Sequence, residues 1–181
     1  MAQNEQILSI FLASPGDVSE ERCRVDAFVC EWNSLWSEEL GINLKLIRWE
    51  THAYPAVGSD GQDVINSQIG EEYEIFLGIM WKRLGTPTGR AASGTVEEFE
   101  RALGRYRTSG SPQMMFYFKK MNSDAGDDEA QMRAVQQFRG ELAEVGLLYW
   151  EFLSPEQFGQ LVRVHLTRQY SKLGQTLSPT P

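Results

Sequence analysis

Short apolar runs alternate along the chain with longer segments of helical periodicity, and this alternation constrains the fold most. Strands separated by helices form parallel sheets with helices on both faces. We therefore predict an α/β fold, a doubly wound, five-stranded, mainly parallel sheet in three layers. The third apolar run is the most continuous, which indicates a central strand. The expected strands, rich in β-branched and aromatic residues, are 7–13, 43–49, 74–81, 113–118 and 147–152.

Helix-start signals occupy the intervals between these runs. Asp17 is expected to cap the first helix, with Glu20 completing the capping pattern. The apolar stripe expected on that helix is Val18, Val25, Val29, Trp32 and Trp36. Further helices are expected at 62–69, from Thr95 onward, at 129–145 and from Ser154 onward.

Size and terminal composition predict one domain. A chain of 181 residues with 41% hydrophobic side chains can bury one core of ordinary domain size. Residues 1–174 are expected to form this domain. The end of the chain, 175–181, has the composition of a linker, so C-terminal domains of a longer chain are expected partners.

Charge and residue usage disfavour several classes of function. A net charge of −8 repels nucleic acids and anionic membranes, so neither is expected as a partner. The polar N-terminus and the lack of a long apolar stretch predict a cytoplasmic protein. Cys23 and Cys30 would lie about 10 Å apart on one helix, too far for a disulfide, and are expected to be reduced core residues. With His52 and His165 far apart in sequence, no metal is expected.

Two irregular segments, 52–61 and 82–94, follow strands. Together with the turn at 14–17 they are expected to form one rim at the carboxyl edge of the sheet, where open α/β sheets bind ligands. The second segment carries Lys82, Arg83 and Arg90 and no acidic residue, so it could hold a pyrophosphate, or its cations could simply be solvated. Its three glycines predict a mobile loop with little to bury.

The helix that follows this loop contains the most informative carboxylate. Its apolar stripe is expected to be Val96, Phe99, Leu103 and Tyr106. Glu98 is rotated about 100° from Phe99, so it can face the crevice. A purely structural alternative is a capping box between Thr95 and Glu98. Glu97 is expected to form an ion pair with Arg101 on the solvent face.

Three ordered blocks of sequence, 10–22, 76–86 and 93–100, resemble an uncharacterised TIR-like domain family found at the N-termini of signalling ATPases of the STAND type. The resemblance covers roughly residues 7–103 and implies a flavodoxin-like or TIR-like fold. The Gly94-Thr95-x-x-Glu98 element is also similar to the helix start of nucleoside deoxyribosyltransferases and, more loosely, to the glutamate helix of NAD-cleaving TIR domains. The tryptophan-cysteine dipeptide that precedes the glutamate in TIR domains is replaced here by Val96-Glu97.

Both enzyme groups break an N-glycosidic bond, so the resemblance implies that Glu98 is the catalytic carboxylate. The substrate-binding residues that it implies are Ser14, Pro15, Asp17, Trp81, Arg83, Ser93 and Thr95. NAD would be a substrate, and no cofactor is expected. One carboxylate suffices for this chemistry, because nicotinamide is already a cationic leaving group. Trp49 is expected to seal the edge of the core, and His165 to be structural.

Two hypotheses of different classes follow. The first is a TIR-like effector domain with nucleotide N-glycosidase activity, directed at NAD, in a larger antiviral defence or signalling protein that self-associates. The second is a non-catalytic TIR-like module for protein–protein interaction and self-association, in which Glu98 only caps its helix. A deoxyribosyl transferase is a weaker third reading, because the sequence shows no obvious second acidic residue near a strand end to bind the base.

Overall fold

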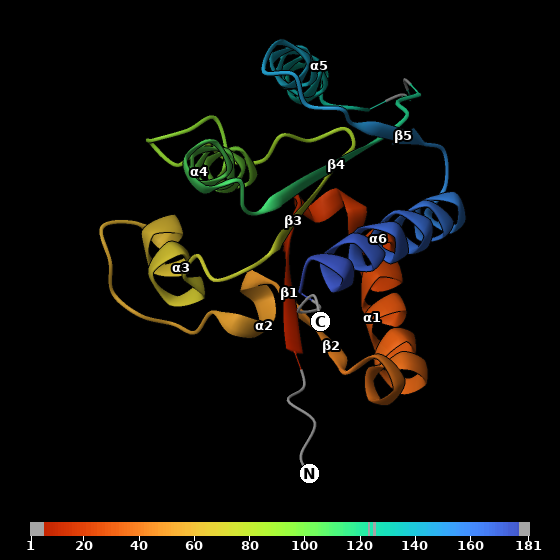
Figure 1. Cartoon of the computed structure of the whole chain (residues 1–181). Helices are drawn as coiled ribbons and strands as arrows, with labels where there is room; N and C mark the ends of the chain where they lie inside the picture. Colours follow the sequence, from red (N-terminus) through yellow and green to blue (C-terminus); the bar gives the residue numbers. More distant parts are fainter. Residues whose placement is uncertain (1–5, 123, 125, 178–181) are drawn as a thin grey trace.

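The computed structural model describes residues 6–122, 124 and 126–177, and it confirms the α/β fold (Figure 1). All strand pairings in the five-stranded sheet are parallel, and the order is β2-β1-β3-β4-β5, so the third strand is central as predicted. The strands are β1 (Gln6–Ala13), β2 (Ile42–Ile47), β3 (Ile75–Met80), β4 (Gln113–Lys119) and β5 (Trp150–Phe152).

Helices follow each strand. They are the 3-10 turn η1 (Gly16–Val18), α1 (Ser19–Leu40), α2 (Trp49–His52), α3 (Gly61–Ile69), α4 (Gly94–Ser109), α5 (Glu129–Glu144) and α6 (Pro155–Leu177). The second strand ends two residues before its predicted end, because Trp49 begins α2. Helix α6 continues past the expected domain boundary at 174, and residues 178–181 of the expected linker lie outside the described residues.

The predicted cap of the first helix is wrong. Asp17 lies in η1, and its carboxylate accepts hydrogen bonds from the backbone N–H groups of Lys82 and Arg83, both at 3.0 Å. Its acceptor oxygen therefore ties the turn after β1 to the loop after β3 instead of capping α1, whose start has no side-chain cap.

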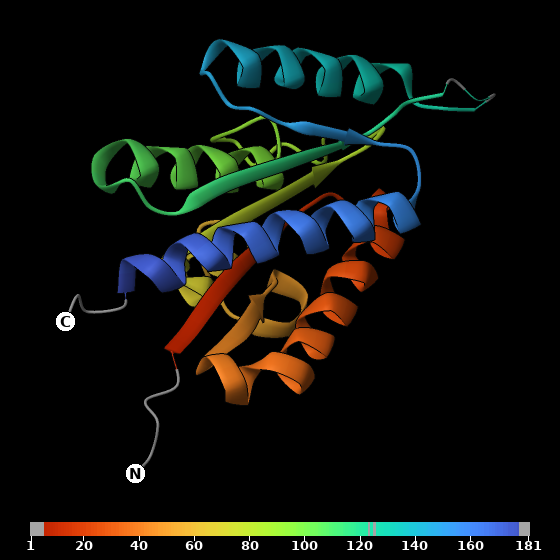
Figure 2. The ribbon, with the colours of Figure 1, turned by 45° about the vertical axis from the view of Figure 1, so that its right-hand side comes forward.

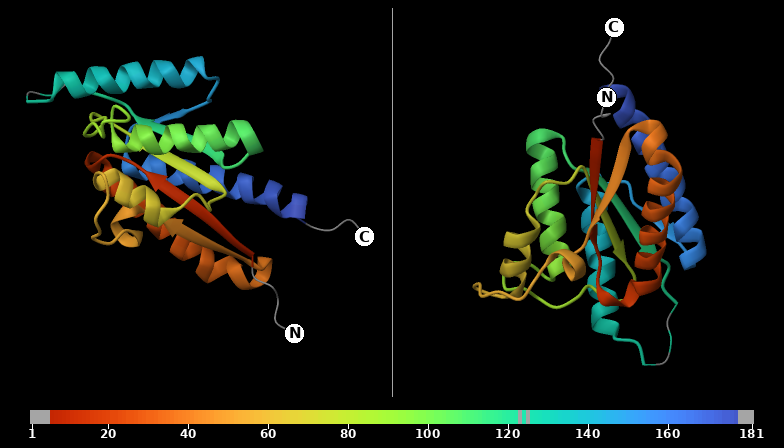
Figure 3. Two further views of the ribbon diagram at one scale, coloured as in Figure 1. Left: turned by 90° about the vertical axis from the view of Figure 1, so that its left-hand side faces the viewer. Right: turned by 90° about the horizontal axis from the view of Figure 1, so that it is seen from below.

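Helices cover both faces of the sheet. In Figure 2, α1 and α6 lie on one face and α4 and α5 on the other. Figure 3 shows that α3 joins α4 on its face. One apolar cluster accordingly joins the sheet to α1 and α6, and a second joins it to α4 and α5.

Phe99 fixes the position of α4. Its ring packs against the rings of Phe76, Phe116 and Phe138, with centroids 5.4–6.1 Å apart. Replacing a buried phenylalanine by alanine typically costs about 3–5 kcal/mol. This packing holds the first half of α4 against β3, β4 and α5.

Several predicted core positions are exposed. Trp36 and Tyr106 are 44% and 43% exposed, because each lies beyond the part of its helix that packs on the core. The two cysteines are free, as expected, but exposed. Cys23 lies about 200° around the helix from buried Val25, which places it on the solvent side. No helix in the described part of the chain is long and apolar enough to cross a membrane.

Candidate functional site

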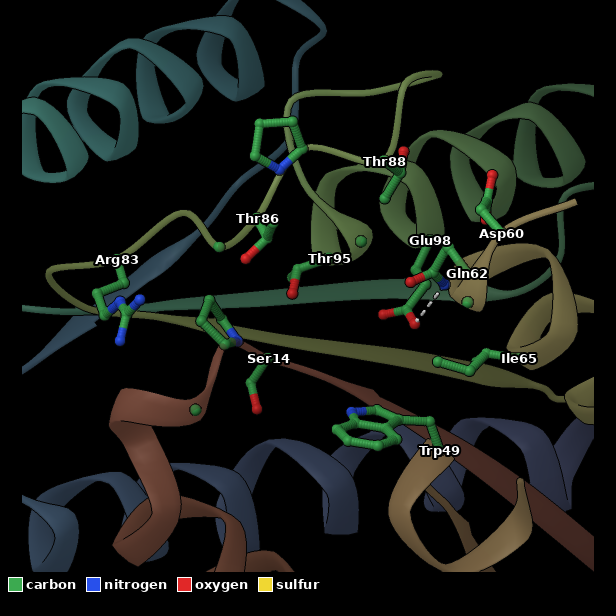
Figure 4. Close-up of a pocket in the computed structure, with 16 residues that line it drawn as sticks. Ser14, Trp49, Asp60, Gln62, Ile65, Arg83, Thr86, Thr88, Thr95 and Glu98 are labelled. Atoms are coloured by element: carbon green, nitrogen blue, oxygen red, sulfur yellow. Dashed lines mark hydrogen bonds between the residues drawn. The ribbon is translucent and has the colours of Figure 1, made fainter. Parts of the chain in front are cut away.

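A pocket of about 450 Å³ opens at the carboxyl edge of the sheet, beside β1 and β3 (Figure 4). The chain leaves β1 toward β2 on one side, while β3 lies on the other side, so this is the point where the strand order reverses. Ligands of doubly wound sheets bind at such switch points. Its walls come from five segments of the chain: the turn after β1, the start of α2, helix α3, the β3–α4 loop and the start of α4.

Glu98 projects into this pocket from the first turns of α4, as its position off the apolar stripe predicted. The capping box with Thr95 is wrong, since α4 begins one residue earlier, at Gly94. Ser93 is the N-cap, and its hydroxyl accepts the N–H of Val96 at 3.2 Å. The carboxylate of Glu98 instead accepts a hydrogen bond from Nε2 of Gln62, at 3.2 Å.

The charge of Glu98 is poorly compensated. Its side chain is only 7% exposed. Burial raises the pKa of Glu98 to about 7, and the nearby Glu97 adds to the rise, while the hydrogen bond from Gln62 opposes it. Both protonation states are therefore populated near neutral pH, which suits a carboxylate that exchanges protons or stabilises a positive charge.

Gln62 is the partner that sequence reasoning missed. A Cβ atom at Gly94 would lie 2.4 Å from Oε1 of Gln62, so glycine at this position lets the glutamine side chain approach the start of α4. Nε2 of Gln62 also donates to Asn66, at 3.1 Å. The sequence did offer a signal for Gln62: it begins the predicted helix 62–69, directly after the irregular segment 52–61 that was expected to form the rim.

The charge of Glu97, unlike that of Glu98, is well compensated. The predicted ion pair between Glu97 and Arg101 is wrong. Glu97 is 6% exposed because it faces α3 and the β3–α4 loop. Its carboxylate accepts hydrogen bonds from Thr88 at 2.6 Å, from Asn66 at 2.8 Å and from Arg90 at 2.9 Å. Burial raises the pKa of Glu97, but these three donors outweigh it and hold the pKa below its ordinary value. Arg101 pairs with Glu71 instead.

Two of the three loop cations are already neutralised. Lys82 binds Asp124 at 2.8 Å and Asp127 at 2.7 Å. Arg90 binds Glu97 at 2.9 Å and Asp60 at 2.8 Å. Each is held by two carboxylates, so neither is free to hold a pyrophosphate, although the Arg90 side chain is 43% exposed. Arg83 is left as a cation that lines the pocket.

The β3–α4 loop is anchored more firmly than its glycines suggest. The N–H groups of Leu84 and Gly85 both donate to Oε1 of Gln131, at 2.8 and 3.2 Å. Leu84 is 5% exposed and belongs to the core, so the expectation that the loop has little to bury is wrong. Mobility of this loop remains a prediction.

The structure brings five of the eight predicted site residues to the pocket: Ser14, Pro15, Arg83, Thr95 and Glu98. The other three do not line it. Asp17 holds the loop backbone, and burial raises its pKa although the N–H groups of Lys82 and Arg83 oppose the rise. Ser93 is the fully buried N-cap of α4. Trp81 packs against the core on the α1–α6 face, with the Lys119 ammonium 4.3 Å from its ring.

Sequence reasoning also missed part of the wall. Trp49 does not seal the core: it is 43% exposed and lines the pocket, because α2 turns it away from the end of β2. His165 is structural as expected, since its Nδ1 lies 2.9 Å from the Tyr117 hydroxyl. The missed lining residues with side chains are Trp49, Asp60, Gln62, Ile65, Thr86, Pro87 and Thr88. Among the described residues, no three His, Cys, Asp or Glu side chains are placed to hold a metal ion.

Two comparisons with known proteins bear on this site. A scan of protein families matches residues 9–167 to a family described as "Domain of unknown function (DUF4062)". A search of curated proteins gave no match. The family match spans every wall of the pocket, from the turn after β1 to the start of α4.

Proposed function

The chain belongs to the DUF4062 domain family, and we propose that it cleaves the N-glycosidic bond of a nucleotide, with NAD as the substrate. Glu98 is the reacting carboxylate. In this proposal the domain is the TIR-like effector module of a larger signalling or defence protein.

The observation that carries the proposal is the environment of Glu98. Its carboxylate is almost fully buried, yet it borders a pocket of about 450 Å³ and, among the described side chains, has a single hydrogen-bond donor, Gln62. A buried carboxylate with a purely structural role is normally paired with a cation as well as hydrogen-bonded. An under-compensated carboxylate facing a cavity is typical of a group whose partner is the ligand.

The chemistry needs one negative charge at the anomeric carbon. When the bond between C1′ and the nicotinamide nitrogen breaks, its electron pair stays on that nitrogen and neutralises the ring. C1′ then becomes oxocarbenium-like, and ionised Glu98 stabilises its positive charge. Water adds to C1′, and the carboxylate accepts the proton that the water loses. No general acid is required, because the leaving group departs neutral.

Binding of a cationic substrate would also prepare Glu98. The pKa of Glu98 is raised to about 7 chiefly by burial. A positive charge next to the carboxylate favours its ionised form and lowers that pKa. The half-exposed ring of Trp49 and the side chain of Ile65 supply apolar surface in the same pocket on which a base can pack.

The alternative function, a non-catalytic module for self-association, depended on Glu98 serving only as a helix cap. Ser93 has that role. The alternative assigns no other role to the buried carboxylate of Glu98, and it remains a prediction together with self-association.

The test is the release of free nicotinamide when the purified protein, at high concentration, is incubated with NAD. Glu98→Gln should reduce release by about 100-fold or more, because the amide cannot stabilise the developing positive charge. Glu100→Gln, an exposed glutamate on the same helix, is the matched control and should retain wild-type release. If the wild type self-associates but releases no nicotinamide, the interaction module is the better account.

A further inference from the structure

Arg83 combines a fixed backbone with a free charge. Its backbone N–H donates to Asp17 at 3.0 Å, and the backbone N–H groups of the next two residues donate to Gln131. These bonds fix the backbone from which the Arg83 side chain extends. Its guanidinium forms no ion pair or hydrogen bond with any side chain described in residues 6–122, 124 and 126–170, although it interacts electrostatically with the Asp17 carboxylate. The other two cations of the loop, Lys82 and Arg90, each bind two carboxylates.

Arg83 is exposed at the rim of the pocket, where a ligand can reach its guanidinium. With a net charge of −8, acidic side chains outnumber basic ones, and most nearby cations have a carboxylate partner. Arg83 lines the pocket without one, which makes it the position where an anionic group of a ligand is best accommodated. The start of α4, at Gly94 and Thr95, lies in the same wall and adds the positive end of a helix dipole.

Arg83 and Glu98 lie on opposite sides of the pocket (Figure 4). Figure 4 shows Arg83 at one end and Glu98 at the other, with the hydroxyls of Thr86 and Thr95 between them. A ligand that used both ends would carry an anion at one end and its reacting centre at the other. The volume of about 450 Å³ falls within the range of about 300–1,000 Å³ typical of small-molecule sites.

We propose that this pocket selects nucleotides over nucleosides, with the 5′-phosphate bound by Arg83. The ribose then lies beside Thr86 and Thr95, and the N-glycosidic bond reaches Glu98. Only the placement of that bond depends on the proposed function, since the phosphate subsite follows from Arg83 itself.

Calorimetric titration of the wild-type protein with nicotinamide mononucleotide and with nicotinamide riboside tests this proposal. We expect the mononucleotide to bind at least about tenfold more tightly, as one charge-assisted pair between phosphate and guanidinium provides. Arg83→Gln should remove this preference and leave the affinity for the riboside unchanged. Arg83→Lys should restore part of it, because the charge returns without the planar fork. Arg133→Gln, an exposed cation on α5, is the control and should keep the full preference.

Three results would overturn the phosphate subsite: equal affinity of the wild type for both ligands, equal weakening of both by Arg83→Gln, or no binding of the mononucleotide at millimolar concentration. Free nicotinamide measured in the same samples separates this proposal from the activity. A preference for the mononucleotide without nicotinamide release supports the subsite and contradicts the glycosidase. Equal binding and equal release from both ligands supports the glycosidase and contradicts the subsite.

Discussion

Two adjacent carboxylates at the start of α4 are buried to almost the same extent, 6% exposed for Glu97 and 7% for Glu98, yet their environments are opposite. Glu97 accepts hydrogen bonds from three side chains, and its pKa lies below the ordinary value although burial acts to raise it. Glu98 has one donor in the described part of the chain, and burial raises its pKa to about 7. The number of donors, and not burial alone, therefore decides the direction in which the pKa of each carboxylate is shifted.

The difference arises from what each side chain faces. Glu97 faces Asn66 on α3 and the segment of the β3–α4 loop that carries Thr88 and Arg90, so it joins three pieces of the chain. Glu98 faces the pocket, where α3 offers only Gln62. Glu97 therefore holds the wall of the pocket in place, and Glu98 is available to a ligand.

The largest expected effect is on the pH dependence of stability. Because the pKa of Glu98 rises on folding from 4.5 to about 7, the folded protein binds this proton more tightly than the unfolded chain does. Its contribution to stability is complete below about pH 4.5 and is lost as the pH rises through about 7. Glu98→Gln has no such charge, so it should be more stable than the wild type by roughly 3 kcal/mol above about pH 8 and equally stable near pH 4.

Urea unfolding of both proteins across this pH range measures the difference directly, since all other titrating groups are shared. A difference that does not change with pH would mean that Glu98 is not buried with an uncompensated charge.

A smaller effect, and one of opposite sign, is expected for Glu97→Ala, which should be less stable than the wild type. Removing this carboxylate leaves the donors of Thr88 and Asn66 without their partner, which should cost about 2 kcal/mol of unfolding free energy. For a chain of this size the melting temperature should fall by about 4–8 °C. Glu100→Ala on the exposed face is the control and should change the unfolding free energy by less than about 0.5 kcal/mol. Equal melting temperatures for the two variants would contradict a structural role for Glu97.

The smallest effect on stability is expected for Gly94→Ala. The new Cβ atom would meet Oε1 of Gln62 at 2.4 Å, so the flexible glutamine must move and its hydrogen bond to Glu98 is lost. The gain in helix propensity offsets this loss, and the net change should stay within about 1 kcal/mol. The pKa of Glu98 should nevertheless rise further, because the bond that lowers it is gone. An unchanged Glu98 titration in this variant would show that Gln62 is not its partner.

The fold was predictable from local patterns. The strong apolar run of β3 and the alternation of strands with helices specify the parallel sheet, its central strand and the shared rim. The pocket position of Glu98 was predictable as well, because helical geometry alone turns it away from Phe99. Errors occurred at the ends of elements, as at Trp49, where a short helix begins directly after β2.

The ionic partners were not predictable, because they come from segments far apart in the sequence. Glu97 and Arg101 have the spacing of a helical ion pair, but Asn66 on α3 donates to Glu97, and Glu71, in the segment after α3, pairs with Arg101. Lys82 and Arg90 looked like free loop cations for the same reason. Their carboxylates, Asp124, Asp127 and Asp60, belong to other loops that the fold brings beside them.

The most direct test of the contrast between Glu97 and Glu98 is a carbon-13 NMR titration of the side-chain carboxyl groups, with both glutamates assigned in the same spectra. We predict that Glu98 titrates with a pKa of about 7 and that Glu97 titrates below the ordinary value of 4.5. If both groups titrated together near 4.5, Glu98 would be an ordinary solvated carboxylate, and the assignment of a reactive group to this pocket would be wrong.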